Sequence, residues 1–477
     1  MFAKPKARYG EKRNLPGGML LLLLSTLVVL PFTFVVSLQA RHHGPSATDP
    51  GPRGGAAGAG GMISGLTADQ QAFFTAGQTT FLEVESVTGS VANTGAGLGP
   101  LFNAESCSAC HAQPATGGTS PSTNPQIAAA TDQGATNSIP YFITQTGPVR
   151  EARFPFTLDL TAFDGGVHDL YTITGRSDAK GCSISQPPFT TAEQEQDIIF
   201  RIPTPVFGAG LIEAIEGSTI TANQTAECSA GSGYGICGYP NFSANDGTIT
   251  RFGWKAQNKS LLMFAGEAYN VEMGVTNILF PNERNETSGC LFNGTPEDDT
   301  NFDTQSPNTA VSADIERFQV FMRFLAPPTP STTCPGGGNC ANGLTQFNSV
   351  GCNLCHNPSF QTGTSSVAAL SNQTANLYSD LLLHQMGPLL ADDVNQGQAA
   401  GDQFRTAPLW GAGQRLFFLH DGRETNIVNA IEDHFSYSGY SNQGVYYPSS
   451  EANAVIQNFN SLSTSNQQDL VDFLRSL

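Results

Sequence analysis

CSACH at residues 107–111 recurs in outline as CNLCH at residues 352–356. In each stretch two cysteines are separated by two residues and a histidine follows the second cysteine, which is the attachment signature of c-type haem. The two thiols of a motif would bond the two vinyl groups of one haem, and the histidine would become a ligand of its iron. The predicted haem-binding residues are Cys107, Cys110 and His111 for the first motif and Cys352, Cys355 and His356 for the second.

A bare CxxC pair has two other chemical uses, as a redox dithiol or as half of a zinc site. A zinc site would need a second pair of thiolate or imidazole ligands at a similar spacing. This chain of 477 residues has only 10 cysteines and 8 histidines, and it contains two complete CxxCH motifs. The pattern therefore predicts two covalently bound haem c groups.

The N-terminus has the pattern of an export segment. Five Lys and Arg residues lie among the first 13, and an apolar run from Met19 to Leu38 follows. A run of this length fits a signal peptide or a membrane-spanning anchor, and we favour an uncleaved anchor over residues 1–40. Gly, Pro and Ala then predict a flexible tether over residues 41–65. We expect the body on the periplasmic side of the inner membrane, anchored, or in the periplasm after signal cleavage.

The cysteines outside the two motifs are even in number, which predicts disulfides in an oxidising compartment. Two pairs are close in sequence and can form local bridges, Cys228 with Cys237 and Cys334 with Cys340, but the sequence cannot choose among the possible connectivities. The remaining two are Cys182 and Cys290.

The chain carries a formal net charge of −18. This charge argues against nucleic acid and anionic lipid surfaces as partners. A small basic redox protein would suit it better as electron donor or acceptor, although acidity also keeps many exported proteins soluble.

The two motifs lie near opposite ends of the body and predict two domains. Residues 66–333 form an N-terminal haem domain, with a large insertion at about 140–310 where β-branched runs among Gly, Pro and Asn predict short strands and ordered loops. Residues 334–477 form the C-terminal domain. No internal repeat beyond the two motifs is evident.

Three helices are predicted from capping and periodicity. Thr67 with Gln70 forms a capping box before a helix that runs past residue 80. An apolar stripe predicts a second helix at residues 312–325. Ser465 with Gln468 forms another capping box, before an amphipathic helix that ends the chain.

Longer stretches extend the pattern beyond the two motifs. They occur in the order GLGPLFNAESCSACH (97–111), GRSDAKGCSISQPPF (175–189), RIPTPVFGAGLIEAI (201–215), RFGWKAQNKSLLMFAGEAYNVEMGVTN (251–277), YSDLLLHQMGPLL (378–390), FRTAPLWG (404–411) and LHDGRET (419–425). Together they resemble the dihaem oxidoreductase family once called thiol oxidoreductases, which is related to bacterial dihaem cytochrome c peroxidases and to MauG. The resemblance covers roughly residues 70–477. It implies a mainly α fold of two class I cytochrome c-like domains with long loops and a strand-containing insertion, two haems, and a peroxidase-like activity.

Function depends on whether each iron has a second protein ligand. His434 follows two isoleucines at helical spacing, and a helix capped at Thr425 would direct all three to the core, where a buried structural histidine is the alternative. In the related peroxidases a ligand follows an HxG element, here residues 420–422, so the resemblance implies His434 as second ligand of the His356 iron. His384 would share a helical face with two leucines, and it fits a hydrogen-bonding role beside the haem better than an iron ligand.

The first motif has no evident second ligand. The related peroxidases have a histidine shortly after this motif, whereas residues 113–126 contain none, which favours an open iron. Cleavage of peroxide at an open iron needs an acid/base group. The candidates are Glu213, Glu267 and Glu272, for which a surface carboxylate is the alternative.

Two further features come from the resemblance. A tryptophan between the haems could relay a radical in the relatives, and the candidates here are Trp254 and Trp410, although a ring packed on a porphyrin is the simpler interpretation. We expect Trp410 near the His356 haem. A calcium ion lies between the domains of the relatives, and Thr406 and Pro408 would offer it oxygens.

The sequence therefore predicts an extracytoplasmic dihaem oxidoreductase. Electrons would enter from a small redox protein at the His356 haem and pass to an open His111 haem, where hydrogen peroxide or another small oxidant is reduced. One alternative is a pure electron-transfer cytochrome in which both irons are closed. Another is a MauG-like or oxygenase-like enzyme that oxidises an organic or protein substrate.

Overall fold

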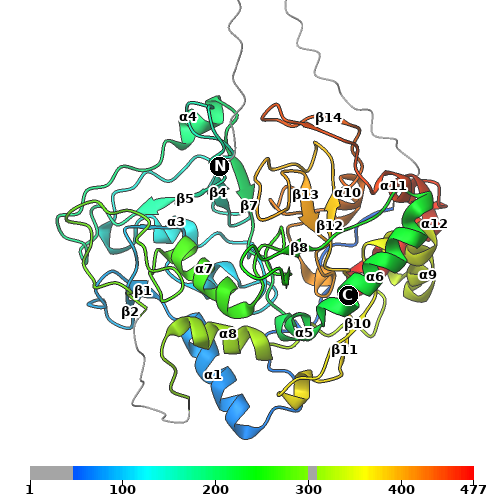
Figure 1. The fold of residues 1–477 in the computed structure, drawn as a ribbon, viewed down its shortest axis with the longest axis horizontal. Coiled ribbons are helices and arrows are strands. Elements are labelled where there is room, and N and C mark those ends of the chain that lie inside the picture. Colours follow the sequence, from blue (N-terminus) through cyan, green and yellow to red (C-terminus); the bar gives the residue numbers. More distant parts are fainter. Residues whose placement is uncertain (1–46, 299–308) are drawn as a thin grey trace, which may run out of the picture. The chain divides into compact units, whose positions relative to one another are not determined.

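The structure, a computed structural model, describes residues 47–298 and 309–477, which belong to the compact unit His43–Leu477 (Figure 1). The predicted signal or anchor at residues 1–40 lies outside the described residues. Within the described ranges, no helix is both long and apolar enough to span a bilayer.

Two pairs of packed helices flank the two motifs. In the part of the chain up to residue 333, here called the N-terminal lobe, α1 (Ala68–Leu82) packs against α8 (Asp314–Phe324). In the C-terminal lobe, residues 334–477, α9 (Cys340–Val350) packs against α12 (Thr464–Ser476). The members of each pair lie side by side in Figure 1 although they are far apart in sequence.

Each helix pair crosses at a glycine. A Cβ atom on Gly77 of α1 would lie 2.5 Å from the carbonyl oxygen of Arg317 in α8. A Cβ atom on Gly343 of α9 would lie 2.0 Å from the carbonyl oxygen of Asp469 in α12. Since real Cβ atoms do not approach a backbone oxygen this closely, both crossings require a residue without a side chain.

The helix starts agree with the sequence in one case and differ in another. The capping box at Thr67 is confirmed, because its hydroxyl accepts from the backbone N–H of Gln70 and the Gln70 side chain accepts from the Thr67 N–H. The predicted cap at Ser465 is wrong. The helix begins two residues earlier, where Ser463 accepts from the N–H of Asn466 at 3.3 Å.

Strands are short and form small separate sheets, so the fold combines helices with small sheets. The sheet with the order β5-β4-β7 and the pair β8-β9 lie within the predicted insertion. The strands are β1 (Glu85–Ser86), β2 (Gly95–Ala96), β3 (Leu101–Phe102), β4 (Glu151–Arg153), β5 (Val167–His168), β6 (Tyr171–Thr172), β7 (Ile199–Arg201), β8 (Asn241–Phe242), β9 (Ile249–Thr250), β10 (Phe360–Gln361), β11 (Thr374–Ala375), β12 (Leu383–Gln385), β13 (Gln403–Arg405), β14 (Gly439–Tyr440) and β15 (Tyr446–Tyr447). The other α-helices are α2 (Cys107–Cys110), α3 (Gln126–Ala129), α4 (Phe189–Gln194), α5 (Ala209–Ala214), α6 (Gly217–Ala230), α7 (Leu261–Met273), α10 (Ile427–Glu432) and α11 (Asn453–Asn460). The class I cytochrome c-like nature of the two lobes, and the boundary between them, stay predictions.

The described part of the predicted tether, residues 47–65, packs against the body. Asp49 forms an ion pair with Arg475 of α12 at 2.7 Å, and both side chains are buried. The same carboxylate accepts from the backbone N–H of Ile427 at the start of α10, at 2.8 Å. Ile63 then donates to a backbone carbonyl of α8. A buried, fully paired charge and these backbone bonds fix a segment that its composition predicts to be free.

The six cysteines outside the motifs form three disulfides, and the four motif cysteines are unpaired. The two local bridges, Cys228 with Cys237 and Cys334 with Cys340, are confirmed. The third bridge joins Cys182 to Cys290 across 108 residues and ties together two ends of the predicted insertion.

At the two glycine crossings, we expect replacement of glycine by alanine to destabilise the protein, which is the opposite of its usual effect in a helix. Replacement of Gly by Ala inside a helix ordinarily stabilises a protein by about 1 kcal/mol. We expect Gly77→Ala and Gly343→Ala to lower the free energy of unfolding instead, by about 1–3 kcal/mol, because the added methyl overpacks the crossing. Denaturant unfolding measures the change. Gly217→Ala at the start of α6 is the matched control, since its Cβ would meet nothing nearer than Ile249 at 3.5 Å. Stabilisation by all three substitutions would show that the crossings are loose.

Candidate haem-binding sites

The first motif lines a cavity of about 150 Å³, here called the first cavity. Cys107, Cys110 and His111 all face it. Nδ1 of His111 lies 3.0 Å from the carbonyl oxygen of Gly118, and because a carbonyl only accepts, Nδ1 carries the proton and Nε2 keeps a free lone pair. Burial lowers the pKa of His111 to about 4, so the ring is neutral.

The second motif repeats this arrangement in a cavity of about 220 Å³, here called the second cavity. Cys352, Cys355 and His356 line it. Nδ1 of His356 donates to the carbonyl oxygen of Tyr378 at 3.0 Å, which again leaves Nε2 free, and burial lowers the pKa of His356 to about 4. Unpaired thiols beside a neutral imidazole in a largely apolar cavity fit a thioether-linked haem. The two motifs do not meet, so they do not form one zinc site.

A phenylalanine of each helix pair packs against the motif histidine. The ring of Phe81 in α1 lies edge-on to His111 with 6.0 Å between ring centroids, and Phe347 in α9 lies 6.5 Å from His356. Each phenylalanine follows its crossing glycine by four residues, in GQTTF at 77–81 and GLTQF at 343–347. These stretches are an internal repeat that the sequence analysis did not find.

His434 also lines the second cavity. It lies just beyond the end of α10, whose cap is Asn426 rather than the predicted Thr425, since the Asn426 side chain accepts from the N–H of residue 428 at 2.8 Å. Nδ1 of His434 lies 2.7 Å from the carbonyl oxygen of Ala430 and therefore carries the proton. The free Nε2 makes this ring available as a ligand, and burial lowers its pKa.

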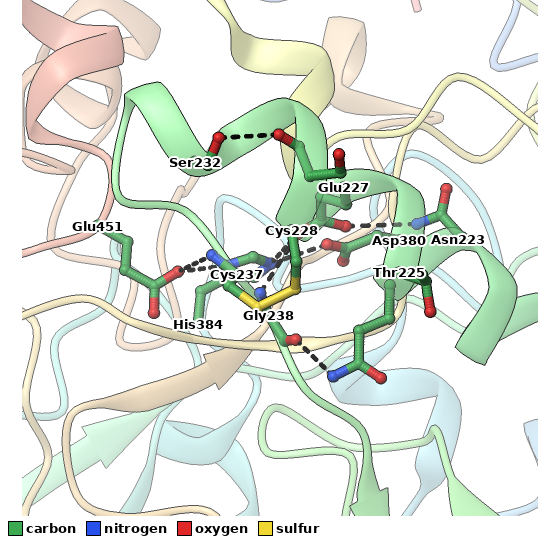
Figure 2. The surroundings of a disulfide bond; sticks show 12 residues. Asn223, Thr225, Glu227, Cys228, Ser232, Cys237, Gly238, Asp380, His384 and Glu451 are labelled. Carbon is green, nitrogen blue, oxygen red and sulfur yellow. Dashed lines mark hydrogen bonds and ion pairs between the residues drawn. A yellow bond between two sulfur atoms is a disulfide. The ribbon is translucent and has the colours of Figure 1, made fainter.

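His384 has no free ring nitrogen. It lies in strand β12 and not on the predicted helix, because residues 383–385 pair with β13. Nε2 lies 2.7 Å from Asp380 and Nδ1 lies 2.9 Å from Glu451 (Figure 2). Burial alone would lower the pKa of His384, but Cys355 and Asp380 raise it well above the usual value. A ring held on both sides favours the hydrogen-bonding role over iron ligation.

Figure 2 shows that His384, Asp380 and Glu227 lie close together near the Cys228–Cys237 disulfide. Glu227 is 3.6 Å from Nε2 of His384. Among the described residues, these three form the group whose atoms are close enough to share a metal ion. The carboxylates and the imidazole of this group already interact with one another, so we interpret it as an internal ion-pair cluster beside Cys355.

The structure separates the three predicted acid/base carboxylates. Glu272 lines the first cavity together with the motif residues. Glu213 lies outside its lining, where it pairs with Arg323 at 2.7 Å and accepts from the N–H of Leu261. Glu267 also lies outside and accepts from Asn258. Only Glu272 of the three is placed to act in the cavity.

Glu151, at the start of β4, is a second carboxylate of the first cavity. Its hydrogen bond with Glu272 makes a buried pair. Burial and then the charge of Glu151 raise the pKa of Glu272 well above its usual value. Burial alone would raise the pKa of Glu151, but Arg153 and the bond from Glu272 lower it overall. The proton therefore resides on Glu272, which donates to ionised Glu151. No motif in the sequence marks Glu151.

Trp254 lines both cavities and donates its indole N–H to the carbonyl of Ile202 at 2.9 Å. Trp410, expected near the His356 site, does not line the second cavity. It lines a small cavity of about 30 Å³, here called the intermediate cavity, which Trp254 also lines. Among the described residues, Trp254 is the aromatic side chain that lines both the first and the second cavity.

The proposed calcium ligands lie among cations. The carbonyl oxygen of Thr406 accepts from the Ser379 hydroxyl at 2.6 Å and from the guanidinium of Arg405 at 3.5 Å. Pro408 lines the intermediate cavity together with Arg405 and Arg415. Two guanidinium groups repel a divalent cation, so this position does not support a calcium site.

Sequence and structure comparisons place the chain among known proteins. A family model described as "Di-haem oxidoreductase, putative peroxidase" matches residues 158–477, a range that includes the second motif and follows the first. No curated protein matches the chain. Among solved structures, one of hydrazine synthase from Kuenenia stuttgartiensis pressurized with xenon is similar at 17% identity, with a TM-score of 0.20. The alignment covers 36% of this chain and 56% of that chain, and at this TM-score it carries no argument.

Proposed function

Because the chain belongs to the di-haem oxidoreductase family, we propose that it is a peroxidase-like enzyme with two haems attached through the motif cysteines. The C-terminal site receives and stores an electron, and the N-terminal site reduces hydrogen peroxide. When bound, the haem groups supply the electron transfer and the redox chemistry of the O–O bond.

The observation that carries this proposal is the difference between the two cavities. The second cavity holds two histidines with a free Nε2, His356 and His434, which suits a closed iron. Among the described residues that line the first cavity, His111 is the sole histidine. A closed site suits electron transfer and an open site suits a small oxidant.

The carboxyl pair of the first cavity supplies the acid/base function. Neutral Glu272 can donate a proton toward the cavity, while ionised Glu151 can accept one. Arg153 stabilises the charge of Glu151, and it lines the same cavity. The pair can thus deliver and recover a proton without placing a net charge in an apolar space.

Location and partner follow from composition. The positive N-terminus and the apolar run at residues 19–38 support an anchor or signal that places the body in the periplasm. The charge of −18 supports a small basic redox protein as electron donor.

One observation favours a second candidate, the pure electron carrier. Met273 and Met322 both line the first cavity. A thioether sulfur is a haem iron ligand in electron-transfer cytochromes. If either sulfur closed the first iron, the protein would transfer electrons and bind no oxidant.

Low-temperature EPR of the oxidised full-length protein, matured in a periplasm, tests the division of roles. We expect one high-spin and one low-spin ferric signal, and we expect His434→Ala to convert the low-spin signal to high spin. His168→Ala is the control, because this ring stacks on Phe154 outside both cavities.

Two low-spin signals in the unmodified protein would contradict the open site. If Met273→Ala or Met322→Ala then converted one of them to high spin, the electron carrier would be the better description. A low-spin signal that persists in His434→Ala would rule out this histidine as the ligand.

Peroxide turnover tests the carboxyl pair. We expect Glu272→Gln and Glu151→Gln each to lower kcat by about 10²–10⁴-fold, the usual contribution of an acid/base group. Activity of the unmodified enzyme should fall as pH rises through the raised pKa of Glu272, since the donor proton is lost there, and this limb should vanish in Glu272→Gln. Glu213→Gln is the control. Equal activity in all three variants would exclude the pair from proton transfer.

A further inference from the structure

Arg415 is a buried cation without a partner. Its exposed fraction is 8%, and neither a hydrogen bond nor an ion pair to its guanidinium occurs within residues 47–298 and 309–477. The side chain lines both the intermediate and the second cavity. Burial lowers the pKa of Arg415 to about 10, so the group is still charged at neutral pH.

Arg405 lies beside it and adds a second positive charge. It is also 8% exposed and lines the same two cavities. Its guanidinium donates to the carbonyl oxygens of Gly253 and Thr406 but forms no ion pair with a carboxylate. Burial lowers the pKa of Arg405 to about 10; the charge of Asp380 partly offsets this shift, and the positive charge of Arg415 adds to it.

Two neighbouring buried cations need a counter-anion, because an uncompensated charge in a low-dielectric interior is strongly destabilising. Glu451 is the carboxylate among the described residues that line the second cavity, and it forms no ion pair with either arginine. Glu451 and Asp380 are bound to the two ring nitrogens of His384. By contrast Arg475, the other buried arginine of this lobe, has its own carboxylate in Asp49. Within residues 47–298 and 309–477 no carboxylate pairs with Arg415, which is consistent with a bound group as the source of the anion.

We propose that Arg415 and Arg405 form the binding site for the propionate carboxylates of the C-terminal haem. This inference rests on the proposed attachment of a haem at Cys352 and Cys355. Haem carries two propionates on the edge away from the thioether bonds, and guanidinium groups bind carboxylates in a bidentate geometry. Both arginines also line the intermediate cavity together with Trp254, so they would hold the propionates on that side of the second cavity.

The two arginines, here called the clamp, also set the reduction potential of this haem. A positive charge beside the propionates favours the reduced state, which carries one positive charge fewer at the iron. Arg415 and Arg405 therefore raise the reduction potential of a bis-histidine haem that would otherwise be low. The arginines tune the site as positioning residues and take no part in the peroxide chemistry.

Two measurements on the full-length, haem-loaded protein test the clamp. In a crystal structure we expect a propionate oxygen within about 3.5 Å of the Arg415 guanidinium. In an optical redox titration, we expect Arg415→Leu to weaken reduction of the low-spin haem at least tenfold, which is a fall of 59 mV for one electron. Arg415→Lys should retain most of the potential. Arg423→Leu is the control, because Arg423 is a half-exposed arginine of the same lobe that pairs with Asp421.

A soluble anion such as inorganic phosphate is the alternative ligand for Arg415 and Arg405. If inorganic phosphate occupied the site, the potential of the unmodified protein would change between low and high phosphate, whereas a propionate clamp makes it constant. Propionates bound elsewhere in the crystal structure would overturn the inference, even if Arg415→Leu failed to mature. Loss of covalent haem from the unmodified protein on a denaturing gel would instead overturn the proposed attachment, so the two failures are distinguishable.

Discussion

The close crossing of two helix pairs is the constraint on which both sites depend. Gly77 lets α1 touch the backbone of α8, and Gly343 lets α9 touch the backbone of α12. One helical turn later, Phe81 and Phe347 meet the two motif histidines. The glycines thus fix where each ring stands, and a backbone carbonyl then fixes which nitrogen carries the proton. A shift at either crossing would be transmitted directly to the iron-binding atom.

The two cavities differ in the buried charges that lie beside them, and the difference is consistent with the proposed roles of the two sites. Around the first cavity Arg153 pairs with Glu151, and Arg201 and Lys255 share Asp392. Arg150 also lines this cavity, where its guanidinium lies over the ring of Phe200. The hydrogen-bonded carboxyl pair there holds its proton on Glu272. Beside the second cavity Arg415 forms neither a hydrogen bond through its guanidinium nor an ion pair with any residue that the structure describes. A hydrogen-bonded carboxyl pair suits proton transfer, whereas a cation without an ion pair suits the binding of an anionic group and the adjustment of a reduction potential.

Features that depend on residues close together in the sequence were predictable. The CxxCH motifs, the cap at Thr67 and the two local disulfides depend on residues less than ten positions apart. Tertiary relations were not predictable: Glu151 reaches Glu272 across 121 residues of chain without a motif, and Asp49 fixes a segment whose composition indicates a free tether. His384 was placed on a helix because two leucines fit a helical period, but pairing with β13 made the segment a strand.

The repeat GQTTF and GLTQF shows why the duplicated architecture was hard to find in one dimension. In the C-terminal lobe the phenylalanine precedes its motif by five residues, whereas in the N-terminal lobe strands β1 to β3 lie between them. No constant period exists, so self-comparison finds only the motifs. What the two halves share is a contact, a glycine crossing followed by a phenylalanine against a histidine. Contacts of this kind tolerate inserted loops, because the packing of the helices stabilises them and a longer loop adds only a small entropic cost. The insertion in the N-terminal lobe could therefore supply Glu151, Glu272 and Trp254 without disturbing the helix pair that holds His111.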